Sequence, residues 1–268
     1  MQKVDILGVK IDALKKNEFR QRLRSLLDAT ERNNKIVTTT YSEFIVTAQK
    51  DERFRAILNS AELNLADGIG ILWAATYLNA KIKNQKLKLE KIKLFLKTAY
   101  WTAFEQEKIR DVIPERLPGA DIIWDVCQIA EQTGNSIFLL GGHGPVDEIL
   151  KNKFPALKIA GRYEGNPNEP ELAERIKKTN TDILLVAFGP IKQEYWLMHN
   201  RSDLNVKIAV GLGGTFDYLV GNKKRAGDTW QKYGLEWLHR LLTQPWRIRR
   251  MWNAIIVFSW LVVRQKMN

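Results

Sequence analysis

The sequence is poor in the residues that build disulfides and metal sites. It contains one cysteine, Cys127, and three histidines among its 268 residues. A single cysteine excludes an internal disulfide framework and fits a reducing compartment. The histidines do not have the spacing of metal ligands, so we expect no bound metal.

Long apolar segments are also missing. The first residues, MQKVDILGVKIDALKK, hold no apolar stretch like that of a secretory signal, so we expect no such signal. The apolar run at residues 254–263 covers only about half of the ~20 residues that cross a bilayer. The length suits one large α/β domain, or a domain with an appendage.

Charge is abundant but unevenly distributed along the chain, whose net charge is +12. Residues 223–268 carry ten Lys and Arg against two acidic residues, and residues 81–113 carry nine against four. The remaining residues are almost neutral, with 23 basic and 24 acidic side chains. Basic segments of this kind attract phosphates on nucleic acid, on anionic lipid or on a substrate.

Short apolar runs alternate with helical patterns. The runs typical of buried strands lie at residues 36–40, 63–66, 137–140, 158–160, 183–188 and 207–210. Helical spacing occurs at residues 17–32, 42–60, 121–133 and 170–178. This alternation predicts a largely parallel sheet. Ligands of such sheets bind beyond the carboxyl ends of the strands, where Thr39, Asp67, Gly141, Gly189 and Gly213 are expected.

Thr39 and Asp67 each have two interpretations. Thr39 is placed to hydrogen-bond a sugar or phosphate, or else belongs to a capping segment with Ser42 as the N-cap. Asp67, followed by Gly68, is placed to act as a general base or to cap the next helix. These two stretches alone leave both choices open.

Two glycine-rich turns follow predicted strands. Residues 141–144, Gly-Gly-His-Gly, would let backbone amides approach a phosphate at a helix N-terminus, or would form a plain tight turn. No Gly-Lys-Ser/Thr follows, so this is not a Walker A loop. At the second turn, residues 213–217, Asp217 is placed to hydrogen-bond a ribose or base, or else the segment is a plain turn. Lys192 and Gln193 are expected to project into the same crevice.

Two basic segments have amphipathic character. Residues 234–242 form a helical pattern that Pro245 ends, and residues 246–252 combine tryptophan with arginine beside the apolar run. This pattern predicts a membrane-interfacial segment, or a terminal helix packed on the core. In residues 81–113, apolar residues recur at helical spacing and form one stripe. This stripe is expected to contact a membrane, the core or another subunit. The stripe consists of Ile92, Phe95, Leu96, Ala99 and Ala103.

An ordered set of short motifs runs along the chain. They are Thr39 with Glu43-Phe44, residues 65–70, 115–121, 140–142, 188–194, 211–217, 224–226, 234–238 and 240–242. In order and spacing, over nearly the whole chain outside residues 81–113, this set resembles the WecG/TagA/CpsF family of bacterial glycosyltransferases. The resemblance implies an inverting, metal-independent enzyme without a cofactor. It also implies a Rossmann-like α/β core, with helices on both faces and a basic amphipathic helical appendage at the C-terminus.

The resemblance also implies roles for individual residues. It implies that Asp67 is the general base, and that Thr39 and Gln193 line the sugar site. The implied nucleotide contacts are Asp217, Tyr163, Gly141, Gly142, Gly213 and Gly214. The implied contacts to the acceptor diphosphate are Arg116, Arg240, Arg247 and Arg250, because the guanidinium fork binds phosphate oxygens bidentately.

Three departures from the family pattern bear on the donor sugar and on the domain layout. Tyr41 stands where the family has Asn, and Pro190-Ile191 stand where it has Ala-Pro. Residues 81–113 replace a short connection. We therefore expect a core at residues 1–222 that contains this basic helical insert, and an appendage at residues 223–268 that completes the active site and contacts the membrane.

We expect this protein to transfer N-acetylmannosamine or a related hexose from UDP to an undecaprenyl-diphosphate-linked sugar. Its expected partners are the UDP-sugar, the polyprenyl-diphosphate-linked acceptor and an anionic membrane surface, with no nucleic acid. Its expected place is the cytoplasm, on the inner face of the plasma membrane, as a monomer or a small homo-oligomer. The alternatives are a UDP-binding regulator on the same fold and a basic nucleic-acid-binding protein.

Overall fold

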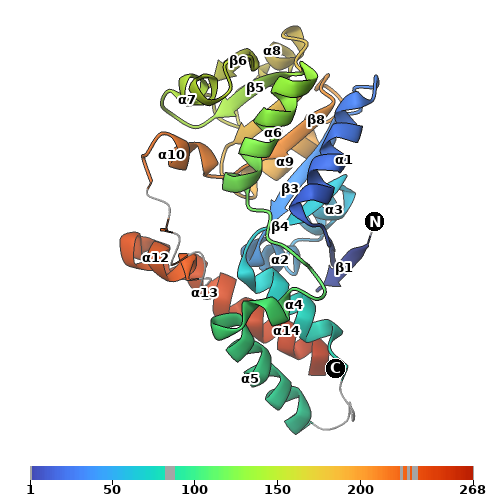
Figure 1. The fold of residues 1–268 in the computed structure, drawn as a ribbon, viewed down its shortest axis with the longest axis vertical. Coiled ribbons are helices and arrows are strands. Elements are labelled where there is room, and N and C mark those ends of the chain that lie inside the picture. Colours follow the sequence, from blue (N-terminus) through green and yellow to red (C-terminus); the bar gives the residue numbers. More distant parts are fainter. Residues whose placement is uncertain (1, 82–87, 224–225, 228–229, 231–234, 268) are drawn as a thin grey trace.

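The computed structural model describes residues 2–81, 88–223, 226–227, 230 and 235–267, without the side chain of Arg240. This part of the chain forms an eight-stranded sheet in the order β1-β2-β4-β3-β8-β7-β5-β6 (Figure 1). The strands are β1 (Lys3–Ile6), β2 (Val9–Asp12), β3 (Lys35–Thr40), β4 (Leu63–Ala66), β5 (Ser136–Gly141), β6 (Lys158–Tyr163), β7 (Ile183–Ala187) and β8 (Ile208–Gly211). Only β1 and β2 pair antiparallel; the other neighbouring strands of this sheet run parallel.

Helices connect the strands and continue beyond the sheet. The helices of the core are α1 (Lys16–Asp28), α2 (Ser42–Ala48), α3 (Glu52–Ser60), α4 (Ile69–Asn79), α5 (Lys88–Phe104), η1 (Gln106–Ile109), α6 (Gly119–Thr133), α7 (Val146–Lys153), α8 (Leu172–Lys178), α9 (Lys192–His199) and α10 (Thr215–Leu219). The C-terminal segment contains α12 (Glu236–Thr243), η2 (Pro245–Arg247), α13 (Ile248–Trp252), the π-helical turn η3 (Asn253–Val257) and α14 (Phe258–Met267).

Successive residues of the inner strands pack on opposite faces of the sheet, as the two-residue period of a strand requires. On β3, Val37 lies in one apolar cluster with Leu23 of α1 and Ile122 of α6. Ile36 lies in another with Ile176 of α8. Both faces are therefore covered, and the predicted fold class, a Rossmann-like and largely parallel sheet with helices on both faces, is confirmed.

A crevice opens in the middle of this sheet, where β3 and β8 are neighbours. The helix after β3, α2, packs on one face through Phe44, whereas the helix after β8, α10, packs on the other through Phe216. Neighbouring strands whose helices leave to opposite faces create a ligand-binding crevice beyond their carboxyl ends.

The hairpin of β1 and β2 was not predicted from the sequence. Its two-residue turn consists of Leu7 and Gly8, both at positive φ, 55° and 80°. Positive φ at both positions matches the twist of a hairpin, but glycine or asparagine usually provides it, so leucine gave no turn signal. The Asp5 side chain secures the turn by accepting a hydrogen bond from the Gly8 amide at 2.9 Å.

The single helix predicted over residues 42–60 is wrong, because the chain breaks between α2 and α3. Asp51 has extended backbone and accepts a hydrogen bond from the Phe54 amide at 2.9 Å, so it caps a new helix. The apolar spacing continues across the break, since Phe44, Phe54 and Leu58 are all buried in one cluster. Periodicity of buried residues alone therefore did not reveal the cap.

The C-terminal helices are confirmed, and α14 packs on the core. Phe258 and Val262 are buried in the same cluster as Phe44 and Trp73. The insert helix α5 lies beside them (Figure 1), and Lys91 donates a hydrogen bond to the Met267 carbonyl at 3.0 Å. The predicted start of the insert, residues 82–87, lies outside the described residues, as do the motif residues 224, 225 and 234.

The apolar stripe predicted for α5 is divided between two environments. Ile92 and Leu96 are 45% and 61% exposed, whereas Phe95 and Ala99 are half-buried. The core side of the helix instead buries Lys91 and Thr98, so the stripe lies across the edge between packed and open surface.

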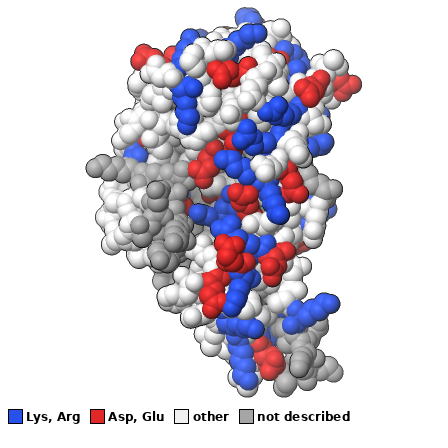
Figure 2. All heavy atoms as spheres, viewed as in Figure 1, with Lys and Arg blue, Asp and Glu red and all other residues white. Residues whose placement is uncertain are grey.

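Surface charges and helix length bear on membrane contact. Figure 2 shows Lys and Arg mixed with Asp and Glu over the face in view. Within the described ranges, none of the helices combines the length and the apolar character needed to cross a bilayer.

Candidate active site

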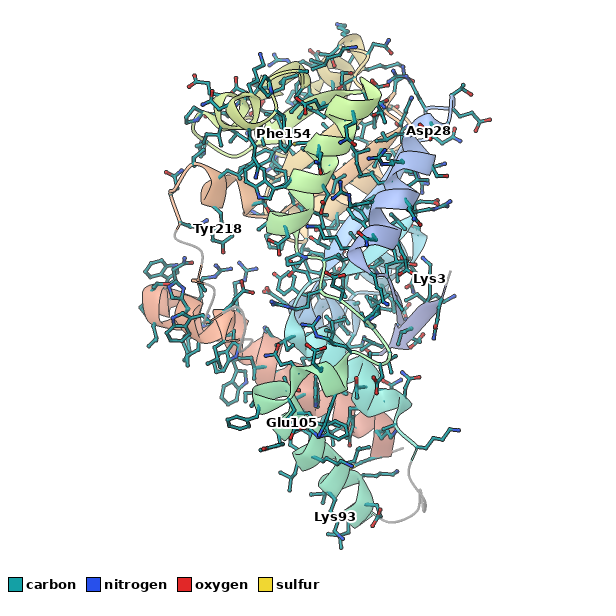
Figure 3. All side chains as sticks on the ribbon, in the orientation of Figure 1. Lys3, Asp28, Lys93, Glu105, Phe154 and Tyr218 are labelled. Atoms are coloured by element: carbon teal, nitrogen blue, oxygen red, sulfur yellow. The ribbon has the colours of Figure 1, made fainter. Side chains whose placement is uncertain are left out.

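A cavity of about 1240 Å³ lies at the carboxyl ends of the central strands. It exceeds the volume of most small-molecule sites, roughly 300–1,000 Å³. Figure 3 labels Tyr218 of α10, one of the residues that line it. The predicted site residues that share its wall are Thr39, Asp67, Arg116, Gly142, Gln193, Gly213, Gly214, Asp217, Arg247 and Arg250. The structure therefore brings most of the predicted site together.

Asp67 stands directly after β4, at the entrance to α4. Its amide donates to the Thr40 carbonyl at 2.8 Å, which extends the pairing with β3 by one residue. Gly68 has φ of 111°, a conformation that favours glycine, and it occupies the N-cap position of α4. A Cβ on Gly70 would lie 2.6 Å from the Ser42 hydroxyl, so this glycine lets α4 approach α2. Asp67 thus stands one residue before the cap position, at the cavity wall.

Thr39 joins the two strands that border the crevice. Its hydroxyl donates to the Gly211 carbonyl at 3.2 Å, and its side chain is buried. The N-cap position of α2 belongs to Tyr41 rather than Ser42. Tyr41 makes no side-chain capping hydrogen bond, so the predicted cap at Ser42 is wrong, and Thr39 itself contributes to the cavity wall.

Gln193 holds the glycine turn after β8. Its side-chain oxygen accepts from the Gly213 amide at 2.8 Å, and its side-chain nitrogen donates to Glu194 at 2.6 Å. Glu194 also accepts from the Ile191 amide at 2.7 Å. Complete burial raises the pKa of Glu194 to about 7. Sequence analysis assigned Glu194 no role; its place beside Gln193 in the ordered motif was the only available signal.

The glycine turn after β5 serves two purposes. Gly142 lines the cavity with φ of 68°, and a Cβ there would lie 2.8 Å from the Phe216 ring. Gly141 does not line the cavity: a Cβ there would lie 3.0 Å from the Ala187 backbone, so it permits close approach to β7. His143 lies at the cavity wall, and its Nδ1 is 2.8 Å from a carboxylate oxygen of Glu164. Glu164 is another residue for which the sequence predicted no role.

The two predicted nucleotide side chains lie apart from each other. Asp217 lines the cavity and forms an ion pair with Lys223, which lines it too. Tyr163 is not brought to this cavity. Its hydroxyl donates to Glu169, ahead of α8, at 2.7 Å, and Arg175 of α8 covers its ring at 4.2 Å. The residues that follow it, 164–167, reach the cavity instead.

The predicted arginines occupy different environments. Arg116 forms an ion pair with Glu236 of α12 at 3.1 Å, and Arg247 donates to Gln244 at 3.0 Å. The position of Arg240 on α12 is described, but its side chain lies outside the described part. The structure therefore places two of these cations at the cavity with partners on the C-terminal segment.

Arg250 is held by α2 and the residue before it. Its Nε and Nη2 contact the Glu43 carboxylate at 2.7–3.0 Å, and Nη2 donates to the Tyr41 hydroxyl at 2.8 Å. Burial lowers the pKa of Arg250, but the hydrogen bonds and charge interactions of Arg250 with Glu43 and Tyr41 raise it by more, so that the net shift is upward. Burial and the neighbouring Glu43 raise the pKa of Tyr41. Tyr41, which departs from the family pattern, thus helps to hold the C-terminal segment in place.

Comparison with known proteins agrees with the motif order. The glycosyl transferase WecG/TagA/CpsF family matches this chain over residues 4–110 and 106–268. A relative from Staphylococcus aureus (strain MRSA252), named N-acetylglucosaminyldiphosphoundecaprenol N-acetyl-beta-D-mannosaminyltransferase, is 24% identical over 98% of this chain and 93% of its own length. One of the same name from Bacillus spizizenii (strain ATCC 23059 / NRRL B-14472 / W23) is 29% identical over 80% of this chain and 74% of its own length.

The family match spans the β3, β4, β7 and β8 strand ends, and with them the whole cavity wall. The Staphylococcus aureus relative aligns over 98% of this chain rather than over the sheet alone. This chain therefore belongs to the WecG/TagA/CpsF glycosyl transferase family.

Proposed function

We propose that this chain transfers N-acetylmannosamine or a related hexose from UDP to a sugar carried on undecaprenyl diphosphate. One observation carries the proposal: a carboxylate, two glycine turns and several cations line a single large cavity at the centre of the sheet. The names of the relatives supply the acceptor class and the sugar.

In the proposed reaction Asp67 accepts the proton of the acceptor hydroxyl. The hydroxyl oxygen attacks the anomeric carbon from the side opposite to UDP, and the bond from that carbon to the UDP oxygen breaks. UDP leaves with the electron pair. The attack from the opposite side inverts the configuration, and Thr39 and Gln193 border the space for the sugar.

The departing diphosphate needs positive potential. Lys192 and Lys223 line the cavity, as do the glycine turns at Gly142 and Gly214, and we assign all of them to the nucleotide. Cations and backbone amides fixed in advance stabilise developing negative charge without further rearrangement. We assign Asp217 to the ribose or base of the nucleotide, and this reaction needs no metal ion.

We assign binding of the acceptor diphosphate to the arginines. Arg116 and Arg247 line the cavity, and a phosphate at Arg250 has to compete with Glu43 for its guanidinium. Because the acceptor is a membrane lipid, we propose that the enzyme works peripherally on the inner face of the plasma membrane, with the C-terminal segment in contact with anionic lipid.

Replacement of Asp67 tests the catalytic assignment. We expect Asp67→Asn to lower kcat by about 10²–10⁴-fold, because the acceptor hydroxyl loses its proton acceptor. UDP affinity should remain near that of the unaltered protein. Product mass after incubation with a panel of UDP-sugars and a lipid-diphosphate sugar gives the activity, and calorimetric titration gives the affinity.

The exposed Asp203 provides the matched control, and Asp203→Asn should behave as the unaltered protein. Normal turnover by Asp67→Asn would refute the assignment. If the unaltered protein binds UDP but transfers no sugar to any acceptor, it is a nucleotide-binding regulator instead.

A further inference from the structure

The cavity has a second, apolar end that the reacting groups do not need. Beyond the polar residues its wall is formed by Trp73 of α4, Phe95 and Ala99 of α5, and Ile255 and Phe258 of the C-terminal segment. Two consecutive helices and the distant C-terminal segment thus enclose one apolar arm. One of them, α5, belongs to the basic segment 81–113.

Aromatic packing fixes the walls of this arm. The Trp73 ring meets Phe95 edge-on at 5.9 Å and Phe258 at 6.3 Å. Its indole nitrogen donates to the Thr98 hydroxyl at 3.0 Å, so the polar atom of Trp73 is satisfied within the protein. The tryptophan therefore presents hydrocarbon surface to the arm, which suits an apolar ligand group.

The polarity of the wall changes along the C-terminal segment from Arg247 onward. Arg247 and Arg250 line the cavity before Ala254, Ile255 and Phe258 do. At 1.5 Å per residue these positions extend over roughly 16 Å. In the chain that enters α4, Asp67 stands two residues before the helix and Trp73 lies within it. Along both segments a polar group thus precedes the apolar wall.

A lipid-linked sugar has its groups in this same order: hydroxyl, sugar ring, diphosphate and prenyl chain. Matching the hydroxyl to Asp67 and the diphosphate to the arginines places the prenyl chain at the apolar arm. The cavity volume, larger than one nucleotide sugar needs, leaves room for it.

The apolar surface continues from the arm to the outside. On α5, Ile92, Leu96 and Tyr100 are 45–61% exposed and lie next to the lining residues Phe95 and Ala99. On the C-terminal segment Ile256 is exposed beside Ile255. A prenyl chain longer than the arm therefore finds an apolar path out of the protein.

We infer that the arm between α5 and the C-terminal segment is a binding site for the first isoprene units of the acceptor lipid. The insert helix supplies one wall, so this site distinguishes a prenyl acceptor from one with the same sugar diphosphate and no chain. The inference rests on the proposed function, because it needs a lipid-linked acceptor.

The test compares two acceptors with the same sugar diphosphate, one carrying a farnesyl chain and one a butyl chain, in vesicle-free solution. We expect kcat/KM to be higher by about tenfold or more for the farnesyl acceptor, since burial of even two methylene groups has an effect of this size. Ala99→Trp fills the arm and should abolish this preference. Ala103→Trp, on the exposed side of the same helix, should retain it.

Ala254→Trp fills the arm from the opposite wall and serves as the second variant if Ala99→Trp does not fold, which loss of UDP binding would reveal. Equal kcat/KM for the two acceptors in the unaltered protein would overturn the inference. So would a farnesyl preference that survives in a folded, arm-filling variant. Absence of transfer to both acceptors would instead count against the proposed function itself.

Discussion

At the scale of single residues, Glu194 has an unusual environment. It is completely buried in the first turn of α9, next to Ile191, whose φ of 71° is rare for a β-branched residue. Its carboxylate links the Ile191 amide to Gln193, which in turn holds the Gly213 amide. These hydrogen bonds connect the turn after β7 to the turn after β8 at the cavity. Protonation of the Glu194 carboxyl group therefore affects both turns.

We predict that Glu194 makes stability depend on pH. Its pKa rises from 4.5 to about 7 on folding, so between these values the unfolded chain is ionised while the folded one keeps the proton. The contribution of the protonated Glu194 carboxyl group to the free energy of unfolding is full below pH 4.5. This contribution is lost as pH rises toward 7. Glu194→Gln should lack this decline, which amounts to about 3 kcal/mol for such a shift.

Urea unfolding between pH 5 and pH 8 measures this effect. Relative to the unaltered protein, the free energy of unfolding of Glu194→Gln should increase as pH rises. Glu148→Gln, at an exposed position on α7, provides the control. Parallel pH profiles for Glu194→Gln and the unaltered protein would contradict the prediction.

At the scale of secondary-structure elements, the C-terminal segment is fastened to the core at two points. Phe258 and Val262 pack in the cluster with α2 and α4. Arg250 binds Glu43, whose side chain is 14% exposed, and Tyr41. Apolar burial holds α14 in place, whereas the ionic contact fixes α13 beside the cavity.

We predict that Glu43→Ala loosens α13 and η3 without unfolding the sheet. Arg250 loses its carboxylate partner, and because its side chain is 37% exposed the cost should be only about 1–2 kcal/mol. Hydrogen exchange of residues 248–257 should accelerate, while exchange in β3 and β8 stays unchanged. Glu52→Ala removes an exposed ion pair on α3 and is the control. Unchanged exchange at residues 248–257 would show that packing alone holds this segment.

At the scale of the whole molecule, the exposed large apolar side chains gather on two neighbouring elements. They lie on α5 and on the segment from α12 to α14, which contact each other. Trp246, Trp252 and Trp260 are 57–75% exposed. Amphipathic surfaces with tryptophan and nearby basic residues suit a membrane interface, so we propose that both elements dock on the same bilayer.

We predict that Leu96→Gln combined with Trp260→Gln weakens binding to anionic vesicles by about tenfold or more, since each large apolar side chain contributes on insertion. Both changes are uncharged, so the loss reports apolar contact, and UDP affinity should not change. Lys151→Gln on α7, away from both elements, is the control. Vesicle co-sedimentation gives the affinity, and full binding by the double variant would refute docking through these surfaces.

Deletion of the insert is a weaker test of the same idea. Removal of α5 would uncover Trp73 and Tyr77, which its Phe95 and Thr98 contact. A deletion variant that failed to bind vesicles would then report loss of packing as well as loss of membrane contact.

The sequence by itself determined strands β3 to β8 of the sheet and the positions of most site residues. Buried parallel strands need continuous apolar runs, so these runs were visible, and the residues after them had to lie at one edge of the sheet. Asp67, Thr39, Gln193 and Asp217 were found in this way, and they line one cavity.

Tertiary structure alone decided which way each side chain turns and what it meets. Tyr163 ends β6, three residues beyond the predicted run at 158–160, and its ring packs toward α8 and Arg175, away from the cavity. The stripe on α5 was visible as a period, yet only contact with Trp73 fixes which side is packed. Periodicity records that neighbouring positions share an environment; the environment itself comes from residues distant in the sequence, which a local pattern does not contain.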